Sequence, residues 1–197
     1  MILSVNCDGI PEDEDAIKTD ELVTNIFEHH VIILTETRTN DLSRLLRHLP
    51  HHILIGKKPV PENHAGRKGF GVAVLASKSV ADFIFLTRVA EQSQSVWAKI
   101  DKKLLNTDRD TMLCAVYIRP ESSAGNAHEV DNQYAHLEAD LHEALAGSYN
   151  ILICGDFNAQ IGSLDEVSDV HFDLLAACPQ LARGRNTQTT QVNRAGR

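Results

Sequence analysis

The 197-residue sequence lacks a long apolar run, a paired-cysteine spacing and an excess of basic residues. Its longest apolar runs, such as "VIIL" and "FIFL", are far too short to cross a lipid bilayer. At the N-terminus no cationic segment precedes a long apolar stretch, so we expect no secretory signal peptide. The net charge of −8 argues against a protein that coats nucleic acid without specificity.

The cysteines also lack a pattern that would mark a metal or redox site. Cys7, Cys114, Cys154 and Cys178 are scattered without C-x-x-C spacing, and three of them fall in strand-like runs. Buried, reduced thiols are the ordinary interpretation of such positions. We therefore expect an intracellular protein, in the nucleus or in the cytoplasm.

The sequence does contain enough apolar residues for a sizeable core. Hydrophobic residues make up 43% of the chain and charged residues 23%, which is typical of a folded globular protein. No internal repeat, low-complexity tract or linker divides the chain. We predict a single domain over residues 1–197.

Short runs rich in Val, Ile and Leu, most of them bounded by Gly, Pro, Asn or Asp, predict β-strands. They cover residues 2–6, 31–36, 53–56, 71–77, 95–101, 112–120 and 151–158. Three or four of these strands follow one another without a helix, which is not the strict βαβα order of a doubly wound fold. The order favours two sheets packed face to face with helices on the outside.

Helices are predicted where apolar residues recur every three or four positions. The clearest stripe consists of Val130, Tyr134, Leu137, Leu141 and Leu145. A second helix is predicted over residues 17–27 and a third around 167–178, whereas "KKPVPENHAGRKG" (57–69) has the prolines, glycines and charges of a long loop.

Polar residues gather at the ends of the predicted strands. They are Asn6, Asp8, Glu36, Tyr117, Asp156 and Asn158. All except the tyrosine are carboxylates or carboxamides, which are costly beside a buried strand unless they are paired, hydrogen-bonded or bound to metal. An oxygen-only set of this kind suits Mg²⁺ or Mn²⁺ rather than zinc.

Each of these residues, taken alone, has an ordinary structural explanation. Glu36 could cap a turn, Asp156 and Asn158 are common turn residues after a strand, and Tyr117 could face the core. The histidine pairs at 29–30 and 51–52 have no convincing ligand spacing, and we interpret them as surface residues.

The order and spacing of these residues along the chain favour a functional site over the separate structural explanations. The segments "SVNCDG", "IILTETR", "GFGVAVLAS", "VWAKI", "VYIRP" and "GDFNAQIG" resemble, in family order, the endonuclease/exonuclease/phosphatase superfamily of deoxyribonuclease I-like proteins. The resemblance covers nearly all of residues 2–197. It implies an α/β fold, a four-layer α/β/β/α sandwich, here without its last strands.

The resemblance also implies a role for each residue in Mg²⁺-dependent phosphodiester hydrolysis. Glu36 would bind the metal with Asn6 beside it, and Asp8 would support them from behind. Tyr117 would donate a hydrogen bond to a phosphate oxygen. Asp156 would orient or deprotonate the attacking water, and Asn158 would position water and phosphate.

Within the superfamily, the chain is most similar to the endonucleases of non-LTR retrotransposons. "RKGFGVAVL" resembles their glycine-rich strand entry, and the tail resembles their R-x-S-x-D-x-x-x-N-x-x-G pattern. In that tail Arg185, Asn193 and Gly196 match, Thr187 replaces serine, and Thr189 stands where an aspartate is usual. DNA is then the expected substrate, and the expected neighbours are a remaining C-terminal segment or the reverse-transcriptase region of a longer polyprotein.

One part of the family pattern does not occur in this sequence. Family members carry a late S-D-H-like segment that completes the phosphate site, and no such segment follows Asp156 here. His171 lies too close to "GDFN" to replace it. We therefore expect a chain truncated at Arg197 and of marginal stability. Two alternatives to a DNA endonuclease stay open: a catalytically inactive remnant, and a phosphoesterase that acts on an inositol phosphate or another small phosphoester.

Overall fold

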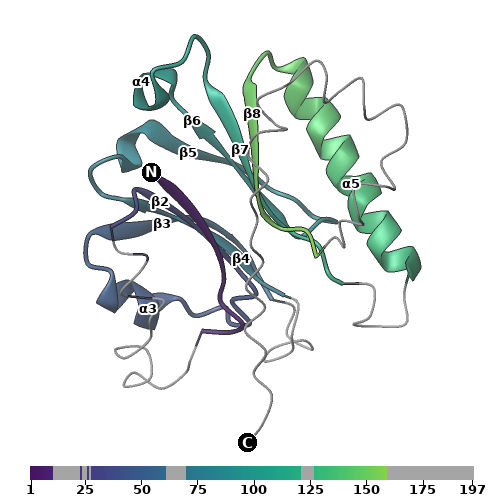
Figure 1. Cartoon of the computed structure of the whole chain (residues 1–197), viewed down its shortest axis with the longest axis horizontal. Helices are drawn as coiled ribbons and strands as arrows, with labels where there is room; N and C mark the ends of the chain where they lie inside the picture. Colours follow the sequence, from purple (N-terminus) through teal and green to yellow (C-terminus); the bar gives the residue numbers. More distant parts are fainter. Residues whose placement is uncertain (11–22, 24–25, 27, 61–69, 121–126, 159–197) are drawn as a thin grey trace, which may run out of the picture. The chain divides into compact units, whose positions relative to one another are not determined.

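A computed structural model of the chain describes residues 1–10, 23, 26, 28–60, 70–120 and 127–158. All of them belong to one unit, residues 1–158. Two four-stranded sheets form this unit (Figure 1). The first sheet has the order β1-β2-β4-β3 and consists of β1 (Ile2–Asn6), β2 (Val31–Thr35), β3 (His52–Lys58) and β4 (Val72–Ser77).

The second sheet has the order β5-β6-β7-β8. Its strands are β5 (Ile84–Val89), β6 (Ser95–Ile100), β7 (Thr111–Tyr117) and β8 (Asn150–Asp156). Each sheet has one parallel pair at an edge, β1 with β2 and β7 with β8, and its other pairs are antiparallel. The parallel pairs matter for function because their carboxyl ends carry the candidate site residues.

Four helical segments with defined bounds connect the strands in the described part of the chain. They are α3 (Ser43–His48), the 3-10 turn η2 (Ala81–Phe83), α4 (Lys102–Leu105) and the long α5 (Ala127–Ala146). The stripe of apolar residues every three or four positions correctly predicts α5, whose Leu137 is buried. Three residues separate the end of α5 from the start of β8.

Three apolar clusters show how the layers pack. The first fills the space between the sheets and combines Val31, Ile33 and Val74 of the first sheet with Val96, Leu113 and Ala115 of the second. The second covers the outer face of the first sheet with α3, through Leu45. The third covers the outer face of the second sheet with α5, through Leu137. This α/β/β/α layering confirms the predicted fold class.

Strands β2, β4 and β7 are buried at every residue because both of their faces are covered. Such strands have nearly continuous apolar sequences rather than an alternating pattern. This explains why "VIIL" and "GVAVLAS" were correctly predicted as strands. The predicted seven strands are all present, with ends that shift by a few residues.

Sequence reasoning missed β5, α3 and α4. Strand β5 lies at the edge of its sheet, and Phe85 and Leu86 are 48% and 47% exposed, so no pattern of buried residues marks it. The helices α3 and α4 are too short for a helical period to show. Residues 57 and 58 belong to β3 rather than to the predicted loop. Most of the helix predicted over 17–27 and all of that around 167–178 lie outside the described residues.

The described cysteines agree with the sequence-based interpretation. Cys114 is buried, and Cys7 and Cys154 are half-buried. Burial raises the pKa of the Cys154 thiol, which keeps it protonated. Among the helices of the described residues, none is long and apolar enough to cross a membrane.

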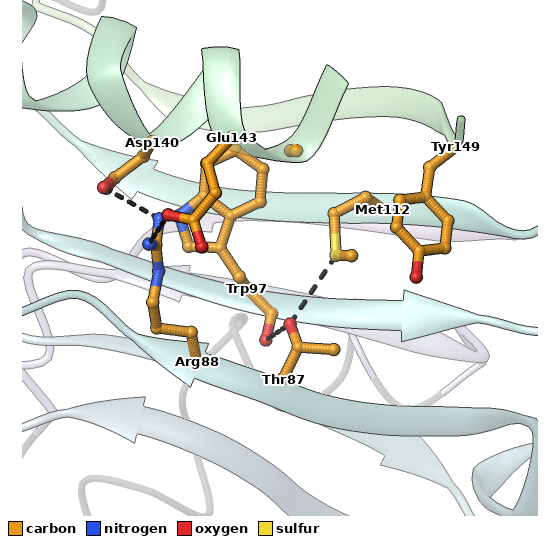
Figure 2. A pocket seen from close by; sticks show the side chains of 8 residues that line it. Thr87, Arg88, Trp97, Met112, Asp140, Glu143 and Tyr149 are labelled. Atoms are coloured by element: carbon orange, nitrogen blue, oxygen red, sulfur yellow. Dashed lines mark hydrogen bonds and ion pairs between the residues drawn. The ribbon is translucent and has the colours of Figure 1, made fainter. Parts of the chain in front are cut away.

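Arg88 of β5 fastens α5 to the second sheet (Figure 2). Its guanidinium lies 2.7 Å from Asp140 and 2.6 Å from Glu143, both on α5, and 5.8 Å from the ring centre of Trp97. These side chains line a cavity of about 220 Å³ between the helix and the sheet. Asp140 is 18% exposed and Glu143 75% exposed, so Asp140 depends more on the guanidinium than Glu143 does.

We therefore expect Arg88→Gln to lower the free energy of unfolding by about 1–2 kcal/mol, because it leaves a half-buried carboxylate without its cation. Glu143→Gln, at the exposed end of the same cluster, should cost less than about 0.5 kcal/mol. Urea unfolding of both variants measures the difference. Equal losses in the two variants would show that Arg88 does not fasten the helix in this way.

Candidate active site

The carboxyl ends of four strands meet at one place in the described unit. Asn6 ends β1, Glu36 directly follows β2, and Tyr117 and Asp156 end β7 and β8. The register of each parallel pair aligns these ends, since Asn6 pairs with Thr35 and Tyr117 pairs with Asp156. The sheet order, with a parallel pair in each sheet, thus accounts for the position of the predicted residues.

The Asn6 side chain joins the two carboxylates. Its Nδ2 atom donates to Asp156 Oδ2 at 2.8 Å and to Glu36 Oε1 at 3.2 Å. These carboxylates come from different sheets and lie 120 positions apart in the sequence. The other atom of the amide, Oδ1, accepts a hydrogen bond of 2.9 Å from the backbone N–H of Asp8, which fixes the amide with its nitrogen toward the carboxylates.

Tyr117 reaches the same cluster from the second sheet. Its hydroxyl donates to Glu36 Oε1 at 2.8 Å, although the residue is almost fully buried. Burial, the hydrogen bond to Glu36 and the nearby charges of Glu36 and Asp156 all raise the pKa of Tyr117. The phenol therefore stays neutral and keeps its proton available for donation.

Sequence reasoning missed Arg38, which lies two residues after Glu36. Its Nη2 atom donates to Glu36 Oε2 at 2.9 Å and also to Asp8 Oδ1. The signal was present in "TETR", but an arginine just after a strand is unremarkable until the fold places it against two carboxylates. Arg38 thus links Asp8, which was predicted to support the site, to Glu36.

Glu36 is held in its ionised form by these contacts. Burial alone would raise its pKa, but hydrogen bonds from Arg38, Tyr117 and Asn6 and the charge of Arg38 outweigh burial and lower the pKa. The Glu36 carboxylate is therefore negatively charged and can bind a cation.

Asn158 stabilises the turn that follows Asp156. Its backbone N–H donates to Asp156 Oδ1 at 2.9 Å, and its side-chain Nδ2 donates to the carbonyl of Ile118 at 2.8 Å. The first bond closes a turn around the aspartate, and the second ties this turn to the end of β7. Asn158 therefore fixes the orientation of Asp156 in this structure.

Glycine is required directly before Asp156. Gly155 has φ +149°, and a Cβ atom at this position would lie 1.8 Å from the carbonyl oxygen of Val116 on the neighbouring strand. Any side chain would push β8 away from β7 and displace the aspartate. The close approach of the two backbones explains the glycine of "GDFN".

Unfavourable backbone conformations concentrate at the site. Asp8, Glu36, Arg38 and Asn158 have φ between 45° and 53°, the left-handed region that side chains disfavour. In the described residues two other non-glycine residues, Asn106 and Ser148, share this conformation. Strain of this kind is typical of functional sites, where the surrounding contacts hold it in place.

The donor set fits a hard divalent cation. Glu36 and Asp156 offer carboxylate oxygens, and no thiolate or imidazole contributes to the described cluster. Within the described ranges no group of three or more acidic, His or Cys side chains converges. Mg²⁺ commonly binds through one or two carboxylates and completes its coordination with water, so the set is sufficient for it.

The chain belongs to the endonuclease/exonuclease/phosphatase family, whose sequence profile matches residues 3–196. This confirms the superfamily that the sequence motifs indicate. The family contains nucleases and phosphatases, as its description states. No match was found among curated proteins.

Solved structures match the chain at low sequence identity. The crystal structure of TDP2 from C. elegans matches with a TM-score of 0.51 and 13% identity, over 81% of this chain and 48% of that one. The human Nocturnin catalytic domain with bound sulfate anion matches with a TM-score of 0.49 and 16% identity, over 75% of this chain and 57% of that one. This chain thus spans about half the length of these two structures.

The contact between Tyr117 and Glu36 can be tested through pH. Tyr117→Phe removes one of the donors that lower the pKa of Glu36, so the folded-state pKa should rise toward or above the ordinary 4.5. A carboxyl group with a lowered pKa stabilises the fold at pH values above its unfolded-state pKa. This stabilisation is lost as the pH falls through the folded-state pKa. The variant should therefore lose about 1–2 kcal/mol at neutral pH, and less once the pH is well below the ordinary glutamate value.

Tyr134→Phe is a matched control, since the Tyr134 hydroxyl donates to a backbone carbonyl, that of Phe157, on the surface of the unit. It should change stability little and independently of pH. Denaturant unfolding across this pH range gives both results. A loss in Tyr117→Phe that is the same at every pH would contradict the coupling to Glu36.

Proposed function

We propose that the chain hydrolyses phosphodiester bonds at this site with Mg²⁺, or with Mn²⁺ in its place, and that its substrate is DNA. The observation that carries this proposal is the bridge from the Asn6 amide to both Glu36 and Asp156, with the Tyr117 hydroxyl on the same glutamate. Two carboxylates and neutral donors in one cluster are the groups that metal-assisted hydrolysis of a phosphodiester requires.

Glu36 would hold the cation. Asn6 lies within hydrogen-bonding distance of both Glu36 and Asp156. When bound, a divalent cation would neutralise charge on the phosphate and lower the pKa of coordinated water. Asp8 would act indirectly, because it contacts Arg38 and supports the Asn6 amide through its backbone N–H.

Tyr117 would donate a hydrogen bond to a non-bridging phosphate oxygen. A phenol has one proton, and in this structure that proton goes to Glu36 Oε1. The hydroxyl can donate to a phosphate only when it releases the glutamate. Its raised pKa keeps it a neutral donor throughout, so it adds no negative charge beside the phosphate.

Asp156 would accept a proton from the attacking water. The water oxygen forms the new bond to phosphorus, the ester P–O bond breaks, and the leaving oxygen takes up a proton from solvent. Asn158 holds Asp156 by a backbone hydrogen bond of 2.9 Å, so the aspartate needs no reorientation when the water arrives. Such fixed geometry is the protein's main contribution to reactions of this type.

The choice of DNA and of a retroelement origin rests on sequence similarity. The glycine-rich entry of β4 and the tail from Arg185 to Gly196 resemble retrotransposon endonucleases. The residues of that tail lie outside the described ranges.

Two other functions compete with DNA hydrolysis. The acidic net charge of −8 favours a small phosphoester such as an inositol phosphate, since DNA-cutting proteins need cations against the phosphate backbone. The second competing function is a non-catalytic remnant that binds metal.

Nicking of supercoiled plasmid DNA tests the proposal directly. The chain should convert plasmid to the open circle with Mg²⁺ and not with EDTA. Glu36→Gln and Asp156→Asn should each lower the rate by about 10²-fold or more. Glu143→Gln, an equally conservative change of a carboxylate on α5, should leave the rate unchanged.

Full activity in the two site variants would refute the assignment of roles. Release of phosphate from inositol phosphates, with the plasmid left intact, would identify the second substrate class. A folded chain that binds Mg²⁺ and cleaves neither substrate would be the non-catalytic remnant.

A further inference from the structure

The guanidinium of Arg38 supplies positive charge to the carboxylates of the site. It donates to Glu36 Oε2 at 2.9 Å and to Asp8 Oδ1 through the same nitrogen, Nη2. The side chain is 17% exposed and Glu36 12% exposed, so water screens this ion pair weakly. The site therefore contains a cation of its own at the carboxylate that would hold a metal.

The two oxygens of Glu36 have different partners. Oε1 accepts hydrogen bonds from the neutral groups of Asn6 and Tyr117, whereas Oε2 accepts from Arg38. A divalent cation that binds Oε2 must displace the guanidinium or lie directly beside a like charge. At separations of a few ångströms, that repulsion outweighs an ordinary hydrogen bond.

Arg38 also has an alternative position within reach. Asp8 is 76% exposed and already accepts from Nη2, so the guanidinium can leave Glu36 and stay paired with Asp8. Arg38 does not bind Glu36 in a bidentate manner, because its Nε atom is buried without a hydrogen-bond partner. Gly9 leaves room for the side chain, since a Cβ atom there would lie 3.1 Å from Arg38 Cδ.

We propose that Arg38 is the internal counter-ion of the metal-free site, and that it exchanges Glu36 for Asp8 alone when a divalent cation binds. This inference rests on the proposed metal-dependent function. Arg38 thus has a positioning role that sets metal affinity. In the absence of metal it stabilises the neighbouring carboxylates, and it weakens metal binding because it competes with the cation for Glu36.

Calorimetric titration of the full chain with Mg²⁺ separates this role from a merely structural one. Arg38→Gln removes the competing charge and should tighten Mg²⁺ binding by about tenfold or more. Arg38→Lys keeps the charge and should bind within about threefold of the wild-type protein. Arg88→Gln removes an arginine that pairs with Asp140 and Glu143 on α5 and should leave Mg²⁺ affinity unchanged.

Thermal unfolding gives a second readout. Without metal, Arg38→Gln should melt below the wild-type protein, and saturating Mg²⁺ should restore most of the difference. Arg88→Gln should melt lower by the same margin with and without Mg²⁺. A purely structural arginine at position 38 would behave like Arg88.

The wild-type protein tests the exchange without a substitution. Phenylglyoxal modifies accessible arginines, and mass spectrometry of peptides gives the rate at each position. Mg²⁺ should speed modification of Arg38, because the guanidinium leaves Glu36 for the exposed Asp8, and should not affect Arg88.

The outcomes distinguish the two proposals. If the wild-type chain binds Mg²⁺ but Arg38→Gln binds it equally or more weakly, the counter-ion role is wrong and the metal site stands. Unchanged or slower modification of Arg38 in Mg²⁺ has the same meaning. If neither the wild-type chain nor Arg38→Gln binds Mg²⁺, both the counter-ion role and the proposed function fail.

Discussion

The candidate site depends on a bridge between the two sheets. The Asn6 amide nitrogen donates to Glu36, which follows a strand of the first sheet, and to Asp156, which ends a strand of the second. Two carboxylates so close would repel each other in a half-buried place. The amide protons, the Tyr117 hydroxyl and the Arg38 guanidinium offset that repulsion, so the geometry of the site and its charge balance have the same cause.

The topology explains why these groups meet. Each sheet places a parallel pair at one edge, and parallel strands end together. The apolar cluster between the sheets holds the two pairs against each other, so residues from positions 6, 36, 117 and 156 converge. The backbone is left-handed at Glu36, directly after β2, and at Asn158, two residues after the end of β8. The core thus fixes the site, although the core residues take no part in its chemistry.

Much of this arrangement could be predicted from the sequence, for identifiable reasons. Strands covered on both faces have apolar runs that show without an alignment, and "GDFN" combines a backbone approach that only glycine permits with a turn that asparagine closes. Strand β5 could not be predicted because its exposed edge carries Phe85 and Leu86 without a buried pattern. Arg38 could not be predicted because its role arises from contacts that the fold creates, with Asp8 on another strand end 30 positions away.

The measurement that tests the central claim most directly is anomalous X-ray diffraction from crystals of the chain soaked in Mn²⁺. Because Glu36 and Asp156 form one oxygen-donor cluster around Asn6, the anomalous peak should lie in contact with a Glu36 carboxylate oxygen and beside Asp156. An ordered Glu36 with no peak, or a peak bound elsewhere on the chain, would contradict the assignment of this cluster as the metal-binding active site.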